Sequence, residues 1–385
     1  LIIFFQTFII VSVLKNFFRE VNVMAKSIVG VTRGTDKFES FRELLNITNF
    51  DDTLMKALEN SKKNKSDFNI VIKPNMMVFV NPKTFEATVT DKELVEYLVD
   101  HMIKLGFNHI SVCESQNVVG TMLKNHNVEF IAPLIGYDPK GRYKIVDLTH
   151  EPLKFKYLYK NKQGKLKKWK DKVGKTWKEA DFRITFPKCK THEEDWLTLG
   201  IKNVFGCFPP QSKFNRYHVK YEVDGVTPRL LRNFPVHFSF IDAWVGSDGQ
   251  QGYKVESPKP LKMLFGGENV VAVDMEVFKR AGLDYKKSQL QEKAVEQLYD
   301  GVLPQYEVKG DKETMFKDIC QWENMDEEYV NSFDFLEETY IGSAIFNINV
   351  MAEVMDFNTF PPRNILYRLF IWAAKIFYCI FRLFR

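Results

Sequence analysis

Short apolar runs recur along this chain and alternate with segments of helical periodicity. β-branched or aromatic residues dominate six such runs, at Ile28–Thr32, Phe68–Ile72, His109–Val112, Lys144–Val146, Phe182–Phe186 and His237–Ile241. Between two of them, Asp91–Leu105 places Leu94, Leu98, Met102 and Leu105 on one helical face. Alternation of this kind is typical of a mostly parallel sheet with helices on both faces, so we predict an α/β fold.

The amino-acid composition is that of a globular protein from a reducing compartment. With 385 residues, 45% apolar and 27% charged, the chain can bury a large core. Its five cysteines are odd in number and widely spaced, without a C-x-x-C pair. This pattern is atypical of a disulfide framework, a zinc knuckle or an iron–sulfur cluster, so no iron–sulfur cluster is expected. It predicts a reducing compartment, the cytoplasm.

The chain divides into three predicted segments. Met24 opens a stretch that looks like a natural start, so we interpret residues 1–23 as a mis-assigned start or a truncated anchor. No Pro/Gly/Ser-rich linker interrupts the rest, which predicts a single α/β domain over residues 24–360. Residues 326–355 look helical and lead towards the C-terminal tail.

The tail, residues 364–385, predicts an amphipathic helix. Arg368, Lys375 and Arg382 recur every seven residues and form a cationic stripe among almost entirely apolar residues. A helix lying in a membrane interface accounts for both features, which would place the protein peripherally on the inner face of the membrane. The alternative is a terminal helix that packs on its own domain or on a second copy.

A basic excursion interrupts the alternation of strands and helices. Two alternating runs in Lys154–Lys170 flank Asn161–Gly164, which predicts a β-hairpin. Residues 154–220 hold 18 Lys/Arg against six Asp/Glu, although the net charge of the whole chain is only +5. A solvated hairpin is the favoured interpretation. Nucleic acid is not an expected partner, because no recognisable nucleic-acid module accompanies the charge.

Polar residues follow four of the predicted strands. Lys73 and Asn75 come after the second strand, Glu114 after the third, and Asp242 after the last. Lys188, Lys190 and His192 follow Phe186 and alternate, so in an extended chain they project to one side. Because ligands of open α/β sheets bind at the carboxyl ends of the strands, this edge is the predicted site.

The predicted site is cationic. Lys202, Asn203, Arg216 and His218 follow within the same stretch of chain, and so many cations repel one another unless they are neutralised. Either an anionic ligand or internal carboxylates can do this, and the internal candidates are Glu114, Asp242, Glu193, Glu194 and Asp195. The predicted anion-binding residues are Lys73, Asn75, Lys188, Lys190, Lys202, Asn203 and Arg216.

The same residues carry a resemblance to a known family. The runs Lys73–Asn75, Thr90–Asp91, Glu114–Ser115, Ala180–His192, Leu199–Asn203 with Gly206 and His218, Ile241–Gly249 and Val270–Asp274 resemble the domain of unknown function 362. The resemblance spans about residues 26 to 300 and implies an α/β domain without an established reaction. Some members carry iron–sulfur clusters. This chain differs from them in lacking a cysteine cluster, in having Glu114 where Asp is usual, and in lacking Gly-Pro after Gly249.

Two hypotheses for function follow. In the first, the protein is an enzyme acting on a small anionic substrate that bears a phosphate or carboxylate. His192 or His218 serves as general acid/base, while Glu114 and Asp242 orient a histidine or hold a divalent metal. Any further cofactor is unknown. In the second, the protein is a non-catalytic module that binds an anion or a lipid headgroup at a membrane surface.

Overall fold

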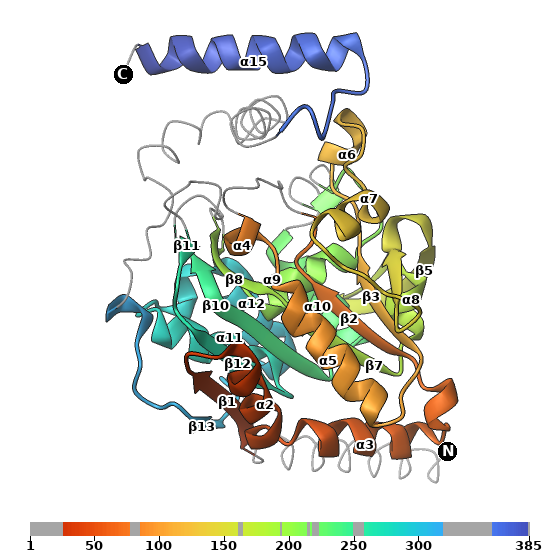
Figure 1. Ribbon diagram of the computed structural model, residues 1–385, viewed down its shortest axis with the longest axis vertical. Helices are drawn as coiled ribbons and strands as arrows, with labels where there is room; N and C mark the ends of the chain where they lie inside the picture. Colours follow the sequence, from red (N-terminus) through yellow and green to blue (C-terminus); the bar gives the residue numbers. More distant parts are fainter. Residues whose placement is uncertain are drawn as a thin grey trace.

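A computed structural model describes residues 26–77, 85–160, 165–192, 195–213, 216–217, 223–248, 258–318 and 356–383. The predicted helical stretch 326–355 and the N-terminal segment 1–23 lie outside these residues. The described part is built around one large sheet flanked by helices, as Figure 1 shows. The α/β prediction is confirmed.

The central sheet is mostly parallel. Its strands run in the order β13-β1-β12-β10-β7-β2-β3-β4, with β8, β9 and β11 attached beside β10. Antiparallel pairing occurs at β12, which lies between β1 and β10, and in the attachments of β9 and β11. The strands are β1 (Ser27–Arg33), β2 (Ile70–Pro74), β3 (Ile110–Glu114), β4 (Lys144–Asp147), β7 (Phe182–Phe186), β8 (Lys188–His192), β9 (Trp196–Thr198), β10 (Phe238–Ser247), β11 (Pro258–Lys259), β12 (Met263–Gly267) and β13 (Tyr306–Gly310).

Helices cover both faces of the sheet because its buried strands are apolar on both sides. One face packs against α2 (Lys37–Ile47), α3 (Phe50–Ser61), α5 (Lys92–Lys104) and α7 (Val128–Leu134). The other packs against α8 (Lys175–Glu179), α9 (Gly200–Asn203), α10 (Val223–Asn233), α11 (Val270–Arg280) and α12 (Gln289–Tyr299). Shorter helices are α4 (Phe85–Thr88) and α6 (Val119–Met122).

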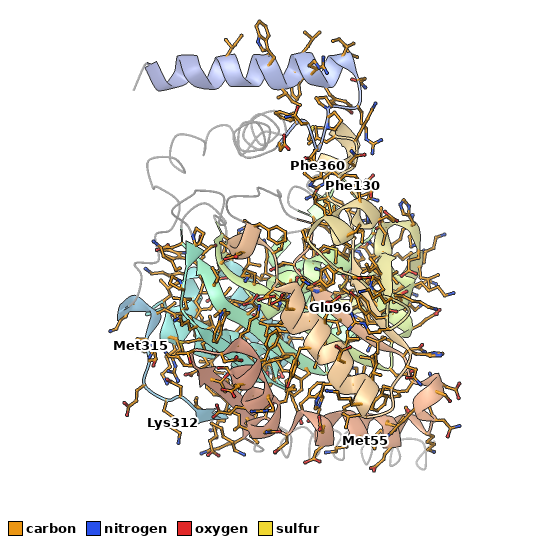
Figure 2. The ribbon with its side chains drawn as sticks, in the orientation of Figure 1. Met55, Glu96, Phe130, Lys312, Met315 and Phe360 are labelled. Carbon is orange, nitrogen blue, oxygen red and sulfur yellow. The ribbon has the colours of Figure 1, made fainter. Side chains whose placement is uncertain are left out.

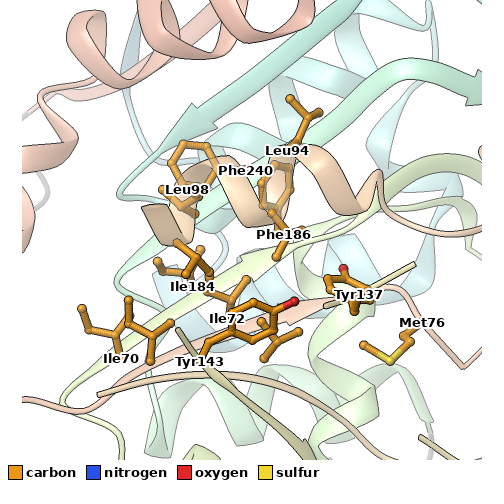
Figure 3. Close-up of a cluster of buried hydrophobic side chains, with 14 of the residues drawn as sticks. Ile70, Ile72, Met76, Leu94, Leu98, Tyr137, Tyr143, Ile184, Phe186 and Phe240 are labelled. Carbon is orange, nitrogen blue, oxygen red and sulfur yellow. The ribbon is translucent and has the colours of Figure 1, made fainter. Parts of the chain in front are cut away.

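The alternation of side chains along β2 shows how the sequence fixes the two faces. Ile70 and Ile72 belong to the core beneath α5, together with Leu94, Leu98 and Ile184 (Figure 3). Val71, between them, joins the core on the opposite face. Successive residues of a strand point to opposite faces of the sheet. The register of β2 against its neighbours therefore decides, for every residue of the strand, which face its side chain joins.

The basic hairpin forms as predicted, as β5 (Pro152–Lys160) and β6 (Leu166–Gly174). Phe155, Tyr157 and Trp169 on its inner face are buried and stack on one another. The outer face pairs Lys154 with Lys172 and Lys156 with Lys170, and all four lysines are exposed. The hairpin therefore has an apolar inner face and a strongly cationic outer face.

The C-terminal helix α15 (Ile365–Leu383) lies beyond α6 at the top of Figure 1. The segment before it docks on the body. Phe360 is buried against Phe130 (Figure 2). Its ring also contacts His126, and Arg363 donates to the Gly120 carbonyl. On the helix itself Ile371 is buried, whereas Leu366 and Trp372 are 72% and 62% exposed. Within the described residues, no helix combines the length and apolarity needed to cross a membrane.

Candidate functional site at the carboxyl edge of the sheet

The predicted site residues lie where the order of the strands reverses. From β2 the chain continues outward to β3 and β4, then returns to β7 on the other side of β2 and continues to β10. Ligands of open α/β sheets bind at such a reversal, outside the carboxyl ends of the strands. Lys73 and Asn75 mark the end of β2, and Lys188 follows the end of β7. The sequence-based prediction therefore places its residues at the reversal.

A buried ion pair joins the ends of β2 and β3. The Lys73 amine lies 2.6 Å from a Glu114 carboxylate oxygen, and both side chains are buried. Gly206 lies directly over the pair, because a Cβ at this position would contact Glu114 Oε1 and approach Lys73 Cε to 2.5 Å. A side chain at residue 206 would therefore occupy the space that this ion pair needs.

Two asparagines connect the strand ends that meet at the reversal point. The Asn203 carbonyl oxygen accepts hydrogen bonds from Lys73 Nζ at 2.9 Å and from Asn75 Nδ2 at 2.8 Å. Its amide nitrogen donates to the Lys73 backbone carbonyl at 2.6 Å and to Thr185 Oγ1 at 2.9 Å. Asn75 Oδ1 accepts the backbone N–H of Lys188 at 2.9 Å. The side chains of Asn203 on α9 and of Asn75, directly after β2, thus fix the ends of β2 and β7 relative to each other.

Two further predicted lysines have internal carboxylate partners. Lys188 Nζ lies 2.6 Å from Asp242 Oδ2, and both groups are buried. Asp242 also accepts the backbone N–H of Asp91 at 2.8 Å. Lys202 pairs with Asp195. Of the two neutralising options that the sequence left open, the internal one therefore applies to Lys73, Lys188 and Lys202, with Glu114, Asp242 and Asp195 as partners.

Lys190 lies in a row of polar residues across three strands. It is opposite Thr198 on β9 and, beyond a register shift in β10 between Asp242 and Ser247, opposite Ser247, so the three residues lie side by side across the strands. All three are buried. Within the described part of the chain, neither the Thr198 nor the Ser247 hydroxyl has a hydrogen-bond partner. His192, half-buried, is two residues further along β8 and faces the same side.

Not all predicted residues join this edge. Arg216 pairs with Asp171 of β6 at 2.8 Å, so it belongs with the basic hairpin and not with the reversal point. Asp171 also accepts from the buried Tyr217 hydroxyl. His218, Glu193 and Glu194 lie outside the described residues. Cys189 is buried in the core on the face of β8 opposite Lys190.

A contact that the sequence did not predict lies at the end of β3. The Lys213 amine lies 2.6 Å from the Ser115 hydroxyl and 3.3 Å from the Gln116 backbone carbonyl. Burial is the main cause that lowers the pKa of Lys213 to about 8. The contact joins residues that are 98 positions apart in the sequence, so no short sequence motif contains both of them.

The end of β4 carries a potential cation-binding group. Single ligand atoms of Glu129, Asp147 and His150 lie within 4.8 Å of one another, with Asp147 buried and the other two exposed. The Gln116 side chain donates to Asp147 from the neighbouring strand end. These are not the metal ligands that the sequence suggested. Of those, Glu114 and Asp242 each accept from a lysine.

Comparison with known proteins gives one match to a family. The family model described as "Domain of unknown function (DUF362)" matches residues 70–279, which span β2 to α11 and include the whole reversal point. No curated protein matches the chain. A crystal structure of a Thermotoga maritima protein, a Northeast Structural Genomics Consortium target, is similar with 13% identity and a TM-score of 0.35. That match covers 64% of this chain and 59% of the Thermotoga maritima chain.

Proposed function

This chain belongs to the domain of unknown function DUF362 family, whose description names no reaction, and we propose from its site that it is an enzyme acting on a small anionic substrate. The substrate bears a phosphate or a carboxylate, which binds over the Thr198–Lys190–Ser247 row. His192, on the same face, serves as general acid/base. His218 is the alternative acid/base.

The observation that carries the proposal is the pair of buried hydroxyls beside Lys190. A buried hydroxyl without a partner costs about 1–3 kcal/mol, so such groups are normally satisfied by protein, water or ligand. Thr198 and Ser247 flank a buried lysine from both sides. A hydroxyl can donate to an anion oxygen, and an ammonium group supplies the matching charge.

The paired lysines have a supporting role in this proposal. Lys73, Lys188 and Lys202 are neutralised by carboxylates, so they add little net charge to the edge. Together with Asn75 and Asn203 they hold the strand ends in place. A rigid edge keeps the substrate in one position relative to the acid/base group, which is where much of the rate enhancement of an enzyme originates.

Removing the Thr198 and Ser247 hydroxyls tests the proposal, because it should weaken anion binding without lowering the stability of the unliganded protein. The full chain is screened by thermal shift against inorganic phosphate, pyrophosphate, citrate and nucleotides. A ligand at 100 times its Kd stabilises a protein by about 2.7 kcal/mol. Thr198→Val and Ser247→Ala should each weaken binding about tenfold, while the stability of the unliganded fold stays equal or rises by about 1 kcal/mol.

Thr191→Val is the matched control. Thr191 is also a buried β8 hydroxyl without a partner among the described residues, but as the neighbour of Lys190 it points to the other face. Its variant should be as stable as the others and should bind with wild-type affinity. The proposal fails if no anion stabilises the wild type, or if all three variants bind equally well. Mg²⁺ and Zn²⁺ are added to the same screen, because Glu129, Asp147 and His150 offer a donor set for a divalent cofactor.

A second candidate function is binding of an anion or lipid headgroup at a membrane surface, and one observation favours it. Large apolar side chains are exposed along α15: Ile365, Leu366, Leu369, Phe370, Trp372 and Ile376. Exposed apolar residues concentrated on one element mark an interaction surface. Arg368 is exposed among them and suits an anionic headgroup.

A further inference from the structure

The end of β3 carries two groups that the anion site does not use. Ser115 and Gln116 directly follow β3, and Lys213 reaches them from the segment after Cys207. The Lys213 amine contacts only three groups among the described residues: the Ser115 hydroxyl, the Gln116 carbonyl and the ring of Phe205. None of these is a carboxylate. Among the described residues, therefore, no carboxylate in contact with this amine holds it as an ammonium ion.

The carboxylate that acts most strongly on Lys213 among the described residues, that of Glu114, is bound by other groups. Glu114 precedes Ser115, and its oxygens are bound by Lys73 Nζ at 2.6 Å and by the backbone N–H of Ser115 at 2.9 Å. The Lys73 ammonium group disfavours a second positive charge close by. The ionisable groups that act on Lys213 are Glu114, Lys73, Cys207 and Asp147. Burial outweighs them all and lowers the pKa of Lys213 to about 8.

A neutral amine fits these contacts well. It has two N–H donors and one lone pair. One N–H can be donated to the Gln116 carbonyl at 3.3 Å, which leaves the lone pair to accept the Ser115 hydroxyl proton across 2.6 Å. A nucleophile and a base within hydrogen-bond reach are the signature of nucleophilic catalysis, and serine–lysine pairs are one form of it.

We propose that Ser115 is a nucleophile and Lys213 its general base, so that the enzyme transfers an acyl or phosphoryl group through a covalent intermediate on Ser115. Ser115 Oγ forms a bond to the electrophilic carbon or phosphorus as its proton passes to Lys213 Nζ. The bond to the leaving group then breaks, and the Lys213 ammonium group protonates the departing atom. Water, deprotonated by Lys213, attacks the Ser115 ester and restores both residues.

This inference rests on the proposed enzymatic function, and it specifies the reaction class. Along the sheet, β3 is separated from β7, which leads into β8, by β2 alone. A substrate whose anionic group binds over Lys190 can therefore extend along the strand ends towards Ser115, since neighbouring strands are about 4.8 Å apart. The substrate class is then a small anionic ester, amide or phosphoanhydride.

Diisopropyl fluorophosphate tests the pair without knowledge of the substrate. Ser115 Oγ would bond to phosphorus, fluoride would leave, and the proton would pass through Lys213 to solvent. Incubation of the full chain, followed by peptide mass spectrometry, should give one diisopropylphosphoryl adduct, on Ser115. Its rate of formation should rise with pH and level off above about 8, as Lys213 loses its proton.

Variants identify the base. Lys213→Met should lower the rate of adduct formation at least tenfold, and Ser115→Ala should abolish the adduct. Lys65→Met is the control, because the Lys65 amine also contacts a backbone carbonyl, that of Leu105 at 2.7 Å, but not a serine. It should react like the wild type.

Wild-type protein alone can overturn the inference. It is wrong if no adduct forms on Ser115 between pH 6 and 10, if the adduct forms on another residue, or if the rate does not depend on pH. An equal rate in a folded Lys213→Met variant also overturns it. The anion screen separates this result from the proposed function: stabilisation by an anion that depends on Thr198, without labelling of Ser115, leaves the anion site standing and removes only the serine–lysine pair.

Discussion

Lys73 Nζ lies 2.6 Å from Glu114 Oε2, in an ion pair that is buried at the carboxyl edge of the sheet. Burying two charges is costly and is offset only when the remaining donors and acceptors are also satisfied. Here Lys73 also donates to Asn203 and to the Pro74 carbonyl, while Glu114 accepts the Ser115 N–H. The pair thus links β2, β3 and α9, and it orients the backbone on which Ser115 sits.

Gly206→Ala should destabilise the protein by about 2–4 kcal/mol, because the added methyl group overlaps both members of the ion pair. Gly225→Ala is the control, and its effect on the free energy of unfolding should have the opposite sign. Gly225 lies within α10, and the atoms nearest to a Cβ there would be the flexible side-chain ends of Arg229 at 3.0 Å and Gln297 at 3.2 Å. Once these side chains shift slightly, alanine should stabilise the helix by up to about 1 kcal/mol. Urea unfolding of both variants measures the difference. Equal effects would contradict the tight packing at Gly206.

Removing one charge of the Lys73–Glu114 ion pair should lower the free energy of unfolding more than removing both charges. Lys73→Met leaves Glu114 buried without its partner and should lower the free energy of unfolding by about 3–5 kcal/mol. In the double variant Lys73→Met/Glu114→Gln no charge remains, so part of this loss should be recovered. A double-mutant cycle by urea unfolding measures the coupling. Additive losses would show that the two side chains do not stabilise each other.

Acid should destabilise the protein through His237. Burial is the main cause that lowers its pKa to about 4, and its Nδ1 accepts the backbone N–H of Arg183 at 3.0 Å, so the fold favours the neutral ring. A depressed pKa contributes stability that is present above pH 6.5 and is lost as pH falls towards 4. This histidine should therefore account for about 2–3 kcal/mol of the stability lost between pH 7 and pH 4.

Comparison of variants isolates that contribution. His237→Phe should be less stable than the wild type at pH 7, because the backbone N–H of Arg183 loses its hydrogen-bond acceptor. The variant should nevertheless lose less stability than the wild type when the pH is lowered. His109→Phe, at an exposed position, should show the wild-type pH dependence. If His237→Phe and the wild type lose the same free energy between pH 7 and pH 4, the histidine is not the acid-sensitive group.

The membrane hypothesis predicts that α15 carries the binding. Trp372→Glu and Leu366→Glu should reduce co-sedimentation of the full chain with vesicles of phosphatidylserine and phosphatidylcholine by at least tenfold, since both side chains are exposed and apolar. Lys154→Glu, on the outer face of the hairpin, changes charge at another element and should have a smaller effect. Wild-type protein that does not sediment with vesicles would remove this function.

The sequence was sufficient to predict the fold because the fold depends on local patterns. Alternating faces, as in Ile70-Val71-Ile72, place residues on both sides of a strand without knowledge of its neighbours. The carboxyl-edge rule then located Lys73, Glu114, Lys188 and Asp242 at one reversal point. Their pairing into buried ion pairs was one of two open options, because the distance between strand ends depends on sheet order, which the sequence alone left undetermined.

The rest of the site depends on contacts between distant segments. Thr198 and Ser247 become neighbours of Lys190 only through the register of β9 and β10 with β8, and hydroxyl residues in strands are too common to be a signal. Ser115 and Lys213 meet across 98 positions. Arg216 was assigned to the site because it is near in sequence, but the hairpin offers it the buried carboxylate of Asp171.

The central claim is that an anion binds over the Thr198–Lys190–Ser247 row, and a crystal of the full chain soaked in tungstate tests it most directly. Tungstate mimics phosphate, and its anomalous scattering locates it without a prior choice of site. The account predicts an anomalous peak within hydrogen-bond distance of Lys190 Nζ and of at least one of the Thr198 and Ser247 hydroxyls, and loss of that peak in Thr198→Val/Ser247→Ala crystals. Peaks confined to exposed lysines of the hairpin, with none at this row, would contradict it.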